Sequence, residues 1–281
     1  MLIKVNNIEF SNEKDFVLIG GINVLEDFDT ALYTAQHFKE VCSRLNISLI
    51  FKASYEKANR SSINSYVGPG LIEGIKMLAK IKEKLDVPLL TDVHLPEEAK
   101  IAAEVCEIIQ IPAFLARQST LIKAMSNTKS VINIKKPQFI SPSQILNIVE
   151  KFQFYGKQDI LICERGTNFG YDNLVVDFLG FGVMKKITNN LPLIFDVTHS
   201  LQCRDVNAKY SGGRRSQLFE LAKSGIANKI AGLFVESHVS PDDAKCDGPS
   251  ALPLELLEEF LILLKQIDQV VKNQKDLVIN W

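Results

Sequence analysis

The chain has 281 residues, 46% of them hydrophobic and 23% charged, and its 32 basic and 33 acidic side chains leave a net charge of −1. This hydrophobic fraction supplies a large core and excludes the disordered, collagen-like and fibrous classes of protein. Because the charges nearly balance, the chain has no overall basic character, and we expect neither nucleic acid nor a membrane surface as its partner.

The cysteines and the N-terminal segment indicate the compartment. Five cysteines lie far apart in the sequence without a CxxC pair, which is typical of free thiols in a reducing environment. The first 16 residues lack the basic and apolar regions of a signal peptide. The apolar segment 254–271 is interrupted by Glu, Lys and Asp, so it is not expected to span a bilayer. We therefore predict a cytoplasmic protein.

Short apolar runs alternate with segments of helical period along the chain. A separate strand or hairpin is expected in residues 1–10, and eight strands are predicted at residues 16–21, 48–54, 88–93, 108–113, 131–136, 159–165, 193–199 and 233–238. The clearest helical segments are residues 71–85, 96–105, 143–155, 215–226 and 252–271. This alternation is typical of βαβ units in a parallel sheet. Eight units predict an α/β protein with a single (β/α)8 TIM barrel domain over residues 1–281 and a short N-terminal extension.

A doubly wound parallel sheet is the alternative architecture. Such a sheet normally carries a glycine-rich phosphate loop after a strand, and the sequence contains neither GxGxxG nor GxxxxGK[ST]. The barrel is therefore favoured.

Polar residues stand where the predicted strands end, and these ends and the loops after them form the reactive face of a barrel. They are Asn23, Lys52, Asp92, Gln110, Arg117, Lys135, Lys136, Arg165, His199 and Glu236. With Lys57 and Arg60 in a following loop, seven cations would converge on one face. Because like charges brought together repel one another and lose hydration, an anion such as a phosphate or carboxylate is expected among them.

Three metal-ligand residue types follow the late strands. His199, Glu236 and Asp247 are compatible with a transition-metal site, and equally with a metal-free site in which the histidine moves protons. The segment 212–218, GGRRSQL, is either an anion-binding loop or an ordinary flexible loop before a helix. Cys246 has no activating partner nearby in the sequence, so a nucleophilic thiol is not expected.

Long motifs then make the sequence recognisable. They are FKASYEKANRSSINSYVGPGLIEGI (51–75), TDVH (91–94), IIQIPAFLARQ (108–118), INIKKPQF (132–139), ERGTNFGYDNLVVD (164–177), FDVTHSLQ (195–202), SGGRR (211–215) and AKCDGPSALPL (244–254). From about residue 20 to the last helix the chain resembles the 3-deoxy-D-manno-octulosonate 8-phosphate synthases.

The resemblance implies a cytoplasmic TIM-barrel enzyme of lipopolysaccharide biosynthesis, usually a homotetramer. Its reaction would join phosphoenolpyruvate, D-arabinose 5-phosphate and water into 3-deoxy-D-manno-octulosonate 8-phosphate and inorganic phosphate. One alternative is the related 3-deoxy-heptulosonate 7-phosphate synthase, which uses erythrose 4-phosphate. The other is a barrel that binds phosphosugars without catalysis, since fold alone does not establish function.

The resemblance also implies roles for individual residues. Arg117, Lys135 and Arg165 would hold phosphoenolpyruvate, and Lys52 would polarise the aldehyde or protonate the new alkoxide. The expected sugar and substrate contacts are Lys57, Asn59, Asp92 and Gln110, with Arg60 and Ser61 reaching the sugar phosphate of a neighbouring subunit. Segments 211–215 and 240–250 are predicted lids.

Asn23 decides the expected cofactor. The family resembled has a metal-dependent branch with Cys at this position and a metal-free branch with Asn. A neutral amide oxygen is a much weaker ligand than a thiolate. We therefore expect no metal and no other cofactor, with Asn23, His199, Glu236 and Asp247 orienting water and substrate.

Overall fold

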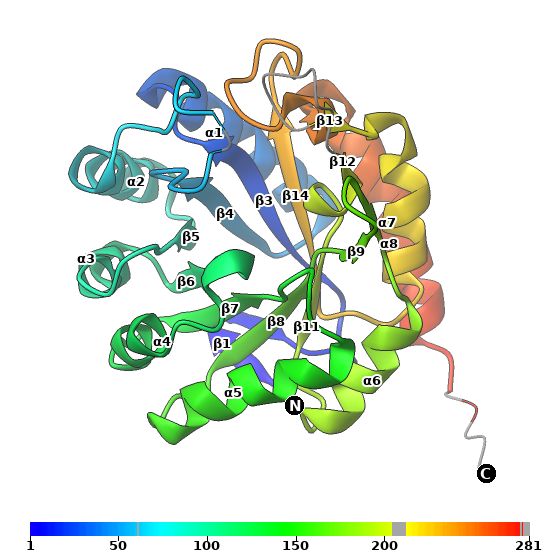
Figure 1. Cartoon of the computed structure of the whole chain (residues 1–281). Helices are drawn as coiled ribbons and strands as arrows, with labels where there is room; N and C mark the ends of the chain where they lie inside the picture. The colour runs from blue at the N-terminus through cyan, green and yellow to red at the C-terminus, as the bar shows by residue number, and fades with distance from the viewer. Residues whose placement is uncertain (61, 204–211, 276, 278–281) are drawn as a thin grey trace.

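The structure is a computed structural model that describes residues 1–281 except 61, 204–211, 276 and 278–281. Eight parallel strands form a closed barrel in the order β11-β8-β7-β6-β5-β4-β3-β14, and β14 pairs with β11 to complete it (Figure 1). The strands are β3 (Val17–Val24), β4 (Leu49–Ser54), β5 (Leu89–Asp92), β6 (Ile108–Ile111), β7 (Val131–Lys135), β8 (Ile160–Glu164), β11 (Leu193–Asp196) and β14 (Gly232–His238). The prediction of a TIM barrel is confirmed. Helices and barrel interior bury the strands from both sides, which explains their continuous apolar runs.

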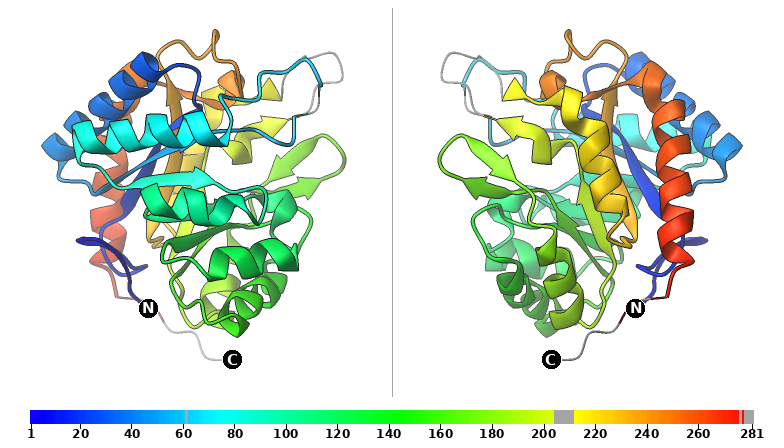
Figure 2. Two further views of the ribbon diagram at one scale, coloured as in Figure 1. Left: turned by 90° about the vertical axis from the view of Figure 1, so that its left-hand side faces the viewer. Right: turned by 90° about the vertical axis from the view of Figure 1, so that its right-hand side faces the viewer.

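In the described part of the chain, eight α-helices surround the barrel, and Figure 2 shows how they lie around it. They are α1 (Phe28–Leu45), α2 (Leu71–Leu85), α3 (Glu98–Val105), α4 (Ser119–Ser126), α5 (Ile145–Phe154), α6 (Leu179–Ile187), α7 (Leu218–Ile226) and α8 (Leu257–Lys272). Within the described residues no helix combines the length and apolar character needed to cross a bilayer.

Four of the predicted helices begin later than expected, and α3 does so by two residues. Residues 142–144 and 215–217 form 3-10 turns ahead of α5 and α7, and residues 252–256 form the short strand β15 (Leu252–Pro253) and another 3-10 turn ahead of α8. Pro142 and Pro253 lack a backbone N–H, so each is tolerated only at a helix start or before it.

Apolar side chains pack into two clusters. The larger lies between strands and helices, and the smaller fills the barrel interior. Ile19, Ile50, Leu90 and Phe234 belong to the interior cluster. The side chains that follow at the carboxyl ends of the strands are polar, so the apolar filling stops below a polar layer.

The N-terminal strands form the expected extension. β1 (Ile3–Val5) and β2 (Ile8–Phe10) pair as an antiparallel hairpin, and Phe10 is fully buried in the interior cluster. The hairpin therefore covers the amino end of the barrel, seen in dark blue at the lower end in Figure 2.

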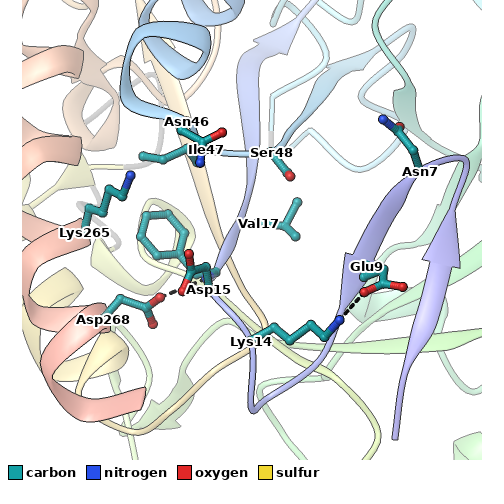
Figure 3. A pocket seen from close by; sticks show the side chains of 11 residues that line it. Asn7, Glu9, Lys14, Asp15, Val17, Asn46, Ile47, Ser48, Lys265 and Asp268 are labelled. Carbon is teal, nitrogen blue, oxygen red and sulfur yellow. Dashed lines mark hydrogen bonds and ion pairs between the residues drawn. The ribbon is translucent and has the colours of Figure 1, made fainter. Parts of the chain in front are cut away.

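A cavity of about 460 Å³ opens at this lower end, between the hairpin, the start of β3 and α8 (Figure 3). Among its lining residues, Lys14 is paired with Glu9, and buried Asp268 accepts the Phe16 N–H at 2.9 Å. Its polar groups thus serve largely to join the hairpin and α8 to the barrel.

The loops at the carboxyl end of the barrel contain short strands. β9 (Thr167–Phe169) pairs with β10 (Asn173–Val175), β12 (Gln202–Cys203) pairs with β13 (Gly212–Gly213), and β15 continues beside β14. These loops surround the mouth of the barrel, where the candidate site lies.

Candidate active site

The polar layer lies at the carboxyl ends of the strands, where barrel enzymes place their active sites. Its buried members include Lys52 on β4, Asp92 on β5, Gln110 on β6, Asn133 and Lys135 on β7, Asp196 on β11 and Glu236 on β14. Five of these seven were predicted from the sequence. Asn133 and Asp196 were not.

Lys52 and Glu236 form the central ion pair. Lys52 Nζ lies 2.6 Å from Glu236 Oε1 and donates to the backbone oxygen of Asn23 at 2.8 Å, and both side chains of the pair are 1% exposed. Burial lowers the pKa of Lys52 even though Glu236 stabilises its charged form. Burial alone would raise the pKa of Glu236, but the charges of His199 and Lys52 lower it to about 2. The site therefore holds an ammonium that gives up its proton more readily than an ordinary lysine.

Close contact between β3 and β4 supports this pair. A side chain at Gly21 would overlap the backbone oxygen of Lys52, so only glycine permits the approach. The register between the two strands shifts between Gly21 and Val24, and such irregularities redirect side chains near active sites. Asn23 lies within this irregular stretch.

His199, Glu236 and Asp247 gather around the side chain of Asn23. His199 Nε2 lies 3.5 Å from Glu236 Oε2 and 3.7 Å from Asp247 Oδ2. Asn23 Nδ2 donates to Glu236 and, at 3.0 Å, to Asp247. The structure thus brings together all four residues that the sequence pointed to.

The Asn23 amide turns its Nδ2 toward the two carboxylates and donates to both. Its Oδ1 has no hydrogen-bond partner among the described residues. Among the described residues no group of three or more His, Cys, Asp or Glu side chains is arranged to hold a metal ion.

Asp196 links His199 to Lys135. It accepts the His199 N–H at 2.9 Å, lies 2.7 Å from His199 Nδ1 and pairs with Lys135 Nζ. Burial would raise its pKa, but the charges of His199 and Lys135 hold it well below the usual range. Lys135 Nζ also lies 3.4 Å from the ring centroid of Phe234, a cation–π contact that holds the ammonium at the centre of the mouth.

Arg165 follows β8, next to β7 and Lys135. The residue is 7% exposed. Its Nη2 donates to Gln202 Oε1 at 2.7 Å, and its Nη1 has no hydrogen-bond partner in the part of the chain that the structure describes. A buried guanidinium with one nitrogen left without a partner is suited to bind an anion.

A second group surrounds Asp92. Its carboxylate accepts hydrogen bonds from Ser54 and Gln110 and lies 3.6 Å from Lys57 Nζ. Burial opposes both charges, yet their mutual attraction raises the pKa of Lys57 and lowers that of Asp92. Lys57, Asp92 and Gln110 therefore share one side of the mouth.

Other predicted residues are more exposed than this centre. Arg117 and Asn59 are exposed, and Arg60 donates to the sulfur of Cys246. Burial raises the pKa of the Cys246 thiol, in line with the expectation that it is no nucleophile. Ser61, and Ser211 of the predicted lid 211–215, fall outside the described residues.

The seven cations are therefore not one repelling cluster, contrary to the expectation from the sequence. Lys52, Lys57 and Lys135 each pair with a buried carboxylate of the chain itself. Asp196 lies inside the predicted strand 193–199, three residues before His199. In the structure β11 already ends at Asp196, and an earlier strand end would have been the signal that points to this carboxylate.

Comparison with known proteins identifies the family of the chain. A model of the DAHP synthetase I family matches residues 2–273. The chain belongs to the DAHP synthetase I family. Its sequence is 62% identical over 278 residues to the 2-dehydro-3-deoxyphosphooctonate aldolase of Parasynechococcus marenigrum (strain WH8102), covering 99% of this chain and 98% of the relative.

Two further relatives carry the same enzyme name. The protein of Prochlorococcus marinus (strain MIT 9313) is 64% identical over 270 residues, or 96% of this chain and 95% of the relative. That of Cronobacter sakazakii (strain ATCC BAA-894) is 55% identical over 276 residues, covering 98% and 97%. Family membership thus rests on nearly the whole chain, and the relatives are enzymes by name.

Proposed function

We propose that the chain joins phosphoenolpyruvate, D-arabinose 5-phosphate and water into 3-deoxy-D-manno-octulosonate 8-phosphate and inorganic phosphate, a transferase step in lipopolysaccharide biosynthesis. The observation that carries the proposal is the pair of buried cations Lys135 and Arg165 at the ends of adjacent strands, with one guanidinium nitrogen facing no described partner. Phosphoenolpyruvate has a phosphate and a carboxylate to offer such a pair. The names and identities of the relatives support the same reaction.

In this proposal the two sides of the mouth bind the two substrates. Lys135 and Arg165 bind phosphoenolpyruvate, and Lys57, Asp92 and Gln110 contact the sugar. The exposed Arg117, assigned to phosphoenolpyruvate, and Asn59, assigned to the sugar, are supported by the resemblance alone. Arg60 and Ser61 are assigned to the sugar phosphate of a neighbouring subunit.

The chemistry follows from this placement. C3 of phosphoenolpyruvate attacks the aldehyde carbon, and Lys52 polarises the aldehyde oxygen and donates the proton that turns the new alkoxide into a hydroxyl. A water molecule adds at C2, and inorganic phosphate leaves by cleavage of the bond between C2 and the bridging oxygen. His199, Glu236 and Asp247 orient the water and the reacting carbon. Holding two polyanions in contact is mainly a matter of positioning and charge compensation.

We also propose that the reaction needs no metal. The support is the donor set, since the Asn23 side chain donates to Glu236 and Asp247 rather than offering an anionic ligand. The variant Asn23→Cys supplies the thiolate and is expected to raise the affinity for Zn²⁺ or Mn²⁺, measured by metal content after dialysis. An unchanged metal content would contradict the proposed geometry.

The deciding experiment is phosphate release from phosphoenolpyruvate by chelator-treated protein, with arabinose 5-phosphate and erythrose 4-phosphate tested side by side. We expect release with arabinose 5-phosphate that the chelator does not reduce. Preference for erythrose 4-phosphate would assign the chain to the heptulosonate enzymes, and activity only after metal addition would refute the metal-free mechanism. Substrate binding without turnover would indicate the non-catalytic barrel.

The resemblance further supports a cytoplasmic homotetramer. Light scattering coupled to size-exclusion chromatography is expected to give four times the chain mass of 31.5 kDa. A monomer mass with full activity would contradict the assignment of Arg60 and Ser61 to a neighbouring subunit.

A further inference from the structure

Lys135 and Lys136 are neighbours in sequence but lie in different surroundings. Side chains alternate between the two faces of a strand, and Lys135 reaches the centre of the mouth, where it pairs with Asp196. Lys136 is fully buried, and its Nζ lies 3.5 Å from Glu164 Oε2. Its other contacts are the oxygens of Pro137 and the Thr167 side chain, each at 3.3 Å. Lys136 is therefore surrounded by the chain's own oxygens.

The Glu164 carboxylate fixes the turn that carries Arg165. Glu164 Oε1 accepts the backbone N–H of Arg165 at 3.0 Å and that of Gly166 at 2.6 Å. Gly166 has a φ of +91°, a conformation that glycine adopts without strain. Because one oxygen holds two consecutive N–H groups, it restrains the backbone from which the guanidinium extends.

The ion pair of Lys136 and Glu164 is costly to break. Burial raises the pKa of Glu164 and lowers that of Lys136, so each charge is maintained by the other. Removing one partner leaves an unpaired buried charge, whereas replacing both by neutral groups is tolerated.

From these contacts we propose that Glu164 is a positioning residue, which holds the Arg165 guanidinium toward the mouth, and that Lys136 serves as the counter-ion of Glu164 and does not bind substrate. The inference rests on the proposed function, because it takes the ligand of Arg165 to be phosphoenolpyruvate. It assigns different tasks to two adjacent lysines that a sequence motif would treat as equivalent.

Four variants separate these roles: Lys136→Met, Lys136→Met/Glu164→Gln, Lys136→Met/Glu164→Leu, and Lys186→Met as a control with an exposed lysine on α6. Phosphoenolpyruvate binding is measured by calorimetric titration of each. Lys136→Met is expected to weaken binding about tenfold or more, because the unpaired Glu164 carboxylate disturbs the turn. The Gln double variant keeps the acceptor without the charge, so its Kd should return to within about threefold of the parent. The Leu double variant lacks the acceptor and should stay about tenfold weaker.

The KM for arabinose 5-phosphate serves as the control for a general disturbance of the fold, which would weaken the binding of both substrates. We expect this KM to remain within about twofold of the parent value in all four variants. If the Gln double variant binds as weakly as Lys136→Met, Lys136 contacts the ligand and the inference is wrong. If the Gln and Leu double variants bind phosphoenolpyruvate equally well, the acceptor at position 164 does not matter, and the positioning role of Glu164 is wrong. If Lys136→Met does not fold, the two double variants still decide whether Lys136 binds the ligand and whether Glu164 positions Arg165. A parent that binds no phosphoenolpyruvate would instead overturn the proposed function, and this inference with it.

Discussion

Replacement of Asp196 by Asn removes a single charge from the centre of the mouth. The carboxylate is fully buried between His199 and Lys135 and accepts hydrogen bonds from both the backbone and, at 2.7 Å, the ring of His199. An amide preserves the shape of the side chain and one acceptor oxygen. Its NH2 group, however, faces Lys135 Nζ and His199 Nδ1, which are themselves donors. The variant therefore removes the charge with little change of shape, and the pH dependence separates the contribution of the charge from that of the altered hydrogen bonds.

The expected loss of stability at pH 7 is about 3–5 kcal/mol, the usual effect of breaking a buried ion pair on one side. The pKa of Asp196 is lower in the folded chain than in the unfolded chain, so its charge contributes stability above the unfolded pKa of about 3.9 and loses it as the pH falls. At pH 3 protonation of the unfolded chain alone removes about 1.3 kcal/mol. The difference between parent and variant should shrink by that amount.

Urea unfolding of both proteins at equal concentration, from pH 7 to pH 3, measures this difference. The matched control is Asp159→Asn, an exposed carboxylate just before β8, which should change stability by about 0.5 kcal/mol or less throughout. A constant difference between parent and Asp196→Asn across the pH range would refute the reasoning, because the loss would then come from shape and not from charge.

Three further predictions concern binding, packing and domain organisation. Arg165→Lys should raise the KM for phosphoenolpyruvate about tenfold, because an ammonium cannot make the bidentate contact of a guanidinium; an unchanged KM would place the ligand elsewhere. Gly21→Ala should destabilise the chain by about 3 kcal/mol in urea unfolding, since its methyl group meets the Lys52 backbone. Gly182→Ala on α6, where a methyl group meets nothing within 4 Å, should leave stability unchanged or raise it by about 1 kcal/mol. If residues 1–281 form one domain, circular dichroism and tyrosine fluorescence should report one coincident unfolding transition, and separate midpoints would indicate two units.

The eight strands were predictable because each is buried on both faces, which makes the apolar run itself the signal. Helices were less uniform. α6 contains Gly180 and Gly182, so it does not stand out by its period, and α1 and α4 were also absent from the clearest predicted segments. The predicted start of α8 was too early, because Leu252 and Pro253 resemble the residues at the start of a helix. In the structure they form a short strand beside β14.

The site was predictable in its residue types but not in its pairing. Strand ends gave Lys52, Asp92 and Glu236 directly, because a barrel brings all these ends to one face. Lys52 and Glu236 are 184 positions apart, and only closure of the barrel decides that they meet. Asp196 was overlooked because the predicted strand was extended to His199, which placed this carboxylate inside the strand, whereas β11 ends at Asp196.

The pairing changes how the cations should be understood. Each buried lysine of the mouth meets a carboxylate of the chain, so the lysines stay in place without relying on a substrate anion. Each ion pair also fixes the orientation of its ammonium group. The site therefore has to reorganise less when negative charge develops on the aldehyde oxygen. Burial lowers the pKa of Lys52 below that of a surface lysine, and this makes it a stronger acid toward an alkoxide. Arg165 differs, because one of its nitrogens faces no described partner, and an incoming phosphate or carboxylate therefore adds a contact there without displacing one.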